Sequence, residues 1–150
     1  MFRKIKRRLR VGSQQDNIDT IYTGIDEPLP RNIERVKERL NEIFSECSDY
    51  IQREIVCGED GSVRILVSYI EGFVDKKILN QDVVRPILDY FSSAERQDKA
   101  KRVYQLIKEC IISNNEVREV ESLQQAVYKI VSGDAVLFVD GSKSALVVGV

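Results

Sequence analysis

The chain has 150 residues, 43% hydrophobic and 31% charged, with 23 cations, 24 anions, three cysteines and no histidine. These values are typical of a globular protein with one domain or two small lobes. No apolar stretch approaches the roughly 20 residues that span a bilayer, and the basic N-terminus lacks the apolar core of a secretory signal. The lack of histidine and of any Cys-x-x-Cys pair argues against a zinc site or a Cys–His nucleophile.

The first ten residues form a basic block in a chain that is otherwise acidic. The block holds six cations and no anion: Arg3, Lys4, Lys6, Arg7, Arg8 and Arg10. Blocks of like charge are commonly solvated arms, so residues 1–28 are predicted to be a flexible tail and linker. The block is also a candidate contact with anionic lipid headgroups, near which each cation contributes about 1 kcal/mol. Nucleic acid is a weaker alternative, because the rest of the chain carries an excess of acid.

A helix and two strands are predicted after Pro28-Leu29-Pro30. Apolar residues recur at helical spacing over residues 33–44, and Asn32 is the expected N-cap. Residues 51–57 and 63–70 are predicted strands that are joined by a turn at Gly58–Ser62. The second strand, VRILVSYI, is expected to be central, because both of its faces are largely apolar.

Helices are predicted to follow this hairpin. Residues 76–91 have helical spacing, but Pro86 lacks an amide donor, so two short helices are expected, with Asn80 or Asp82 starting the second. The capping-box pattern at Ser92–Glu95 predicts a further helix that ends near residues 113–115. Val117–Val120 is expected to be a short strand or an extended link.

The last third of the chain repeats the order helix, strand, turn, strand. A capping box at Ser122–Gln125 opens a predicted helix that ends at Gly133. Two apolar runs, Ala135–Val139 and Ala145–Val150, flank Asp140-Gly141-Ser142-Lys143, which is a strong hairpin signal. The sequence ends in the second run, whose apolar faces would need cover. We therefore expect the chain to be part of a larger protein.

These elements predict a mixed α/β fold of two small lobes, each with a hairpin-containing sheet packed by helices. Residues 29–115 would form the first lobe. Residues 116–150 would form the start of the second lobe, which would be incomplete.

No group of side chains has the spacing of a catalytic, cofactor or metal site, so the sequence predicts a protein that is not an enzyme and holds no cofactor. Glu71 and Asp75 follow the 63–70 strand, at a place where α/β proteins often bind ligands. Asp140 lies in the last hairpin turn. These three carboxylates are the candidate cleft or interface residues, and a polar strand exit or a turn former is the simpler interpretation of each.

Four stretches, taken in order, resemble the N-terminal hydrophilic domain of the A subunit of GerA-family spore germinant receptors. They are Ser48-Asp49 at a strand entry, Tyr69–Asp75 at a strand exit, Asn80–Pro86 in a helix and Gly133–Gly141 at the last hairpin. The resemblance covers about residues 33–150. The chain departs from the family pattern because it ends before the Arg-Gly and Glu-Pro motifs and the membrane spans that follow this hairpin.

The resemblance implies a role in spore germination, within a complex of A, B and C subunits in the spore inner membrane that responds to nutrients and starts ion release. The implied partners are B- and C-type receptor subunits, copies of the chain itself and an anionic membrane surface. This segment would act on the cytosolic side as an assembly and signalling domain. The alternative is a module that binds a small ligand, the germinant, in a cleft between two lobes.

Overall fold

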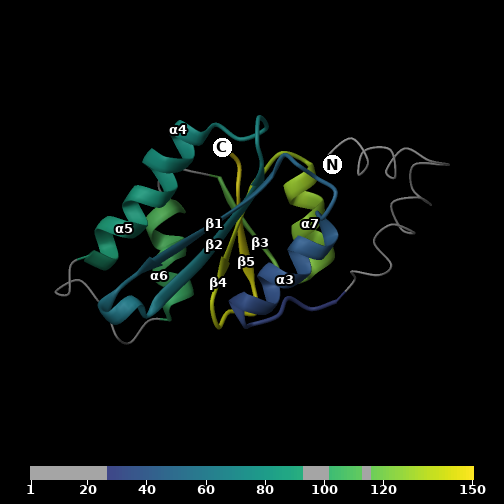
Figure 1. Cartoon of the computed structure of the whole chain (residues 1–150). Coiled ribbons are helices and arrows are strands. Elements are labelled where there is room, and N and C mark those ends of the chain that lie inside the picture. Colours follow the sequence, from purple (N-terminus) through teal and green to yellow (C-terminus); the bar gives the residue numbers. More distant parts are fainter. Residues whose placement is uncertain (1–26, 93–101, 113–115) are drawn as a thin grey trace.

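The computed structural model describes residues 27–92, 102–112 and 116–150, which form a five-stranded antiparallel sheet with helices on both faces (Figure 1). The strand order is β1-β2-β4-β5-β3. The strands are β1 (Tyr50–Cys57), β2 (Val63–Ile70), β3 (Val117–Val120), β4 (Ala135–Val139) and β5 (Ala145–Val148). The predicted mixed α/β class is confirmed.

Alternation of side chains along the strands gives the sheet two apolar faces. Helices α3 (Ile33–Ile43) and α7 (Leu123–Val131) cover one face, where Leu66 and Phe138 are buried. The other face carries α4 (Lys76–Ile78), α5 (Arg85–Ser92) and α6 (Val103–Ile112), which pack over Ile65 and Leu137. The sheet is therefore the middle layer of three, and its interior strands are covered on both sides.

The two predicted hairpins share one sheet, which corrects the expectation of a separate sheet for each lobe. β2 pairs antiparallel with β4, from Ile65 opposite Val139 to Ser68 opposite Val136. β2 and β4 are apolar on their two faces, and helices cover those faces. The backbone groups of each strand are therefore satisfied by a neighbouring strand along each edge. As a result β2 is an interior strand, as expected, but β4 holds the middle position.

The helical stretch after β2 is continuous, where two separate helices were predicted. α4 begins at the N-cap Asp75, passes through a π-helical turn over Leu79–Val84 and continues as α5. The Arg85 N–H donates to the Asn80 carbonyl, a π-type bond that falls directly before Pro86. The change of bonding pattern thus occurs where the chain lacks an amide donor, and the helix continues without a break.

The predicted helix ends within the described residues have the expected caps. Asn32 Oδ1 accepts the Glu34 N–H at 2.9 Å, and Ser122 Oγ accepts the Gln125 N–H at 3.1 Å. Gly133 ends α7 with a φ of +106°, which favours glycine. Of the predicted capping box, Ser92 is the last residue of α5, and its hydroxyl donates to the Asp89 carbonyl at 2.9 Å. Residues 93–95, the predicted helix end at 113–115 and the tail before residue 27 lie outside the described residues.

A short strap, residues 27–29, runs beside the end of β3. Pro28 makes an isolated antiparallel bridge with Ser122. The Leu29 N–H donates to the Glu121 carbonyl at 3.2 Å, and Arg39 Nε donates to the Glu27 carboxylate at 2.7 Å. The strap is therefore anchored both to the segment before α7 and to α3.

Candidate functional site

The three candidate carboxylates lie at opposite ends of the sheet. The Asp140 N–H donates to the Arg64 carbonyl at 3.0 Å, near the start of β2. Glu71 and Asp75 follow the other end of β2, and the seven residues from Arg64 to Glu71 span roughly 23 Å of extended strand. Because β2 and β4 are antiparallel, their carboxyl ends point in opposite directions. The structure therefore brings Glu71 and Asp75 together and keeps Asp140 apart from them.

Glu71 and Asp75 both have local partners. Asp75 Oδ1 accepts the N–H groups of Lys77 and Ile78 at 3.0 and 3.2 Å, so it caps the start of α4. Glu71 forms an exposed ion pair with Lys76 at 2.8 Å, and this hydrogen bond raises the pKa of Lys76. A role for the two carboxylates in an interface stays a prediction.

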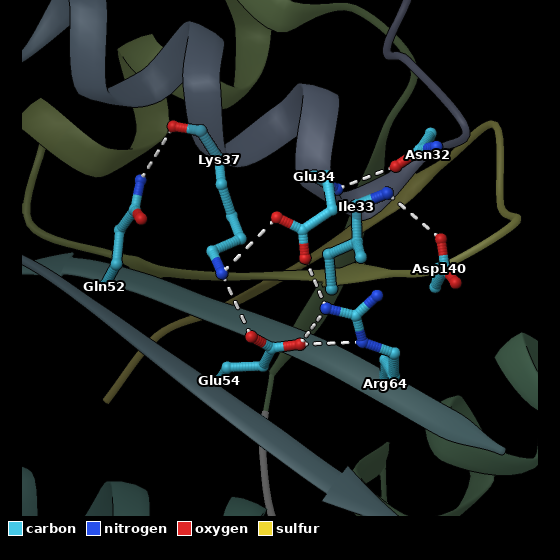
Figure 2. A network of polar contacts seen from close by, with 8 residues as sticks. All are labelled: Asn32, Ile33, Glu34, Lys37, Gln52, Glu54, Arg64 and Asp140. Carbon is cyan, nitrogen blue, oxygen red and sulfur yellow. Dashed lines mark hydrogen bonds and ion pairs between the residues drawn. The ribbon is translucent and has the colours of Figure 1, made fainter. Parts of the chain in front are cut away.

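Asp140 connects the β4–β5 loop to the first turn of α3. Its Oδ1 accepts the N–H of Ile33, 107 positions away in the sequence, at 3.0 Å (Figure 2). The Gly141 N–H donates to the Arg31 carbonyl at 2.6 Å, and Gly141 has a φ of +89° that a side chain would strain. Together with Asn32, the loop thus satisfies amides that the helix itself leaves free. We call these contacts of Asp140 and Gly141 the loop clamp.

A network of charged side chains holds the same helix to the first hairpin (Figure 2). Arg64, on β2, bonds to Glu34 of α3 and donates through Nε to Glu54 of β1 at 2.8 Å. Lys37 of α3 pairs with Glu54 at 3.1 Å, and its carbonyl accepts from Gln52 Nε2 at 3.4 Å. The hydrogen bonds from Lys37 and then Arg64 lower the pKa of Glu54, whereas Glu34 and Glu54 raise the pKa of Arg64. α3 is therefore joined to β1, β2 and the β4–β5 loop.

Sequence reasoning missed the loop clamp and the network because their partners are far apart in the chain. The sequence predicts a turn former at Asp140, and Asp140 does begin the β4–β5 loop. Its contact with Ile33 has no local signal, since it depends on the sheet order that places β4 beside β2. Gln52 and Glu54 lie two positions apart and so share one face of β1, which is the available sign that this face meets a polar surface.

A cavity of about 1060 Å³ opens at the Asp140 end of the sheet, between the start of α6, β3 and the β4–β5 loop. Its lining carries both signs of charge, from Arg31 and Lys143 on one hand and from Glu119 and Asp140 on the other. The Tyr104 hydroxyl in this wall is buried and has no hydrogen-bond partner among the described residues. Burial and then the nearby Glu119 raise the pKa of Tyr104, so its hydroxyl stays a neutral donor.

The described residues offer little for covalent or metal chemistry. No group of three or more cysteine or acidic side chains among them is placed to hold a metal ion. Cys47 is buried and Cys57 and Cys110 are half-buried, and desolvation raises the pKa of all three thiols. They are therefore protonated at neutral pH and weak nucleophiles. In this part of the chain, no helix has the length and apolar character that crossing a bilayer requires. The basic block of residues 1–10 lies outside the described residues.

Residues 38–150 match the protein family described as Bacillus/Clostridium GerA spore germination protein. The chain is also similar to "Spore germination protein KA" of Bacillus subtilis (strain 168), with 27% identity over 123 residues, which are 82% of this chain and 21% of that protein. A similar match, 27% over 125 residues, joins 83% of the chain to 23% of the "Uncharacterized membrane protein YfkQ" of the same strain. The chain thus spans less than a quarter of the length of these curated relatives.

The fold is similar to a crystal structure of the N-terminal domain of the A subunit of the Bacillus megaterium spore germinant receptor GerK3. The TM-score is 0.70, the sequence identity is 24%, and the match covers 83% of this chain and 48% of that chain. This likeness establishes the shared α/β arrangement.

Proposed function

Because the chain belongs to the GerA family of spore germination proteins, we propose that it is the N-terminal part of a germinant-receptor A subunit and acts as an assembly and signalling domain. The match over residues 38–150 and the fold it shares with an A-subunit N-terminal domain support this proposal. The domain would lie on the cytosolic side of the spore inner membrane. It would contact B- and C-type subunits, and the basic block of residues 1–10 would face anionic lipid.

The joining of α3 to three separate parts of the sheet is the observation that carries the signalling role. Asp140 holds the start of the helix to the β4–β5 loop, and Arg64 and Lys37 hold its outer face to β1 and β2. A signal passes through a domain when contacts differ between two states. A partner that displaces α3 would therefore change the position of the β4–β5 loop at the same time, without any chemical step.

The test is made in spores that carry the whole receptor. Asp140→Ala and Arg64→Gln are introduced separately, and nutrient-triggered ion release is measured together with the amount of each receptor subunit in the membrane. We expect slower or absent ion release, or loss of the partner subunits, while the isolated variant domains remain folded. Arg35→Gln, which removes only an exposed i,i+3 pair with Glu38 on α3, is the matched control. Normal ion release at normal subunit levels in both test variants would contradict the proposal.

Binding of a small germinant is the second candidate function, and the charged cavity is the observation that favours it. A cavity with cations, anions and an unpartnered Tyr104 hydroxyl would suit a small zwitterion, whose two ends carry opposite charges. Calorimetry and thermal unfolding with a panel of amino acids and sugars test this function. Binding should weaken in a Tyr104→Phe variant, which keeps the ring and loses the hydroxyl. No heat and no thermal shift across the panel would exclude this candidate.

A further inference from the structure

The two edges of the sheet differ in how they are protected against pairing with another strand. β3 has four residues, exposes the charged side chains of Arg118 and Glu119, and is bordered by the strap that contains Pro28. β1 has eight residues without proline or glycine, and its pairing with β2 runs without a bulge from Tyr50 to Cys57. Short length, charge and proline are the features that keep edge strands from recruiting partners. β1 carries two charged residues, as β3 does, but it is twice as long and has no proline beside it among the described residues.

The outward backbone groups of β1 can be assigned from the pairing with β2. The Glu71 N–H donates to the Asp49 carbonyl at 2.8 Å, which makes these two residues a hydrogen-bonded pair. Bonded positions alternate along antiparallel strands, so residues 51, 53, 55 and 57 bond to β2. The N–H and C=O groups of Tyr50, Gln52, Glu54 and Val56 therefore point away from β2. Within the described ranges no strand pairs with them.

We propose that β1 pairs with β1 of a second copy of this chain, antiparallel, about a two-fold axis at Arg53. In this register Tyr50 lies opposite Val56 of the second copy, and Gln52 lies opposite Glu54. The outward N–H and C=O groups of Gln52 and Glu54 then find partners, whereas the Tyr50 N–H already donates to the Cys47 carbonyl at 3.4 Å in the single chain. Val56, whose side chain is 55% exposed in the single chain, then lies beside Tyr50 of the second copy, and the polar Gln52 lies beside Glu54. The same surface meets itself, as a two-fold interface requires.

The side chains of β1 favour this register over its neighbours. An axis at Glu54 would place two carboxylates directly opposite each other, which destabilises a strand pair. An axis at Gln52 would leave Val56 beyond the paired segment. The chosen register has one like-charge contact, between the two Arg53 residues, and Asn80 Oδ1 holds the Arg53 guanidinium at 2.6 Å on its own copy. Self-pairing is therefore specified by β1 alone, and it does not rest on the proposed function.

The test is sedimentation velocity of the whole 150-residue chain from about 1 µM to about 1 mM, since a single strand pair buries a small area and gives a weak dimer. We expect a monomer–dimer equilibrium. Val56→Lys places a cation on the edge strand of each copy, and it should weaken dimerisation by about tenfold or more. Arg53→Thr should strengthen it by about threefold or more, because it removes the like-charge contact. Ile112→Lys, at a side chain of 53% exposure on α6, is the matched control and should leave it unchanged.

Amide hydrogen exchange supplies the second readout, which does not depend on how a variant folds. In the dimer, the amides of Gln52 and Glu54 should become protected as the wild-type concentration rises, while the amides of residues 51 and 53 stay protected throughout. A chain that remains monomeric at the highest concentration overturns the proposal. A dimer that neither Val56→Lys nor Arg53→Thr affects, or whose formation leaves the Gln52 and Glu54 amides unprotected, overturns it as well.

Discussion

Replacement of Asp140 measures how strongly the β4–β5 loop holds the first turn of α3. Its Oδ1 accepts the Ile33 N–H at 3.0 Å, and Ile33 is 1% exposed, so water does not readily replace the lost partner. Loss of a capping acceptor costs about 1 kcal/mol, and loss of a negative charge beside a helix N-terminus costs about 0.5 kcal/mol. We therefore expect Asp140→Ala to lower the free energy of unfolding by about 1.5 kcal/mol. Asp140→Asn keeps an acceptor oxygen and should lower it by only about 0.5 kcal/mol.

Urea unfolding followed by circular dichroism checks these values through the midpoint, provided that the slope stays constant. In a chain of this size, the alanine variant should also melt roughly 5 °C lower. The smaller loss in Asp140→Asn should shrink at high salt, because it is a charge effect. Asp89→Asn, at an exposed carboxyl on α5, is the control and should match the wild type. Equal losses in the alanine and asparagine variants, or no loss in either, would refute the reasoning.

Two further predictions concern the face of the sheet under α3. Lys37 and Arg64 lower the pKa of Glu54, so its stabilising contribution is complete above the ordinary value of 4.5 and is lost as the pH falls through the lowered pKa. Glu54→Gln should accordingly flatten the acid side of the stability–pH curve measured by urea titration, and an unchanged curve would contradict this assignment. Tyr50→Phe keeps the stacking on Phe44 but leaves the fully buried Ser68 hydroxyl without its 3.0 Å partner, at a cost of about 1–3 kcal/mol. Adding Ser68→Ala should restore part of that loss in a double-mutant cycle, and strictly additive losses would show that the two hydroxyls do not interact.

Local signals explain which parts of the fold could be predicted from the sequence. Asn32 and Ser122 predict the starts of the two helices that they cap. This local signal works in any fold, because the side-chain oxygen accepts a hydrogen bond from an amide that the helix leaves free. The Asp140-Gly141 pair marks the last hairpin for the same reason. Apolar spacing locates β1, β2, β4 and β5 to within one or two residues.

The arrangement of those elements depended on contacts that leave no local sign. The pairing of β2 with β4 joins segments about 70 positions apart, and the sequence of neither strand predicts which strand it pairs with. The same pairing decides that Asp140 lies beside Arg64 and far from Glu71, so it also decides which candidate residues share a surface. Pro86 lacks an amide donor, and this predicts a break between two helices. A π-helical turn accommodates the missing donor equally well, so the helix continues.

Proteins that can add strands at both sides of a sheet polymerise without limit, which is the route to fibrils. At the other edge of the described sheet, β3 is short, exposes Arg118 and Glu119 and is followed closely by Ser122, which bridges Pro28, so this edge is a poor template for a further strand. In two copies joined through β1, the free edge of each sheet is paired with that of the other copy. The stoichiometry would then stop at two, and crowding would raise the share of paired molecules without producing longer assemblies.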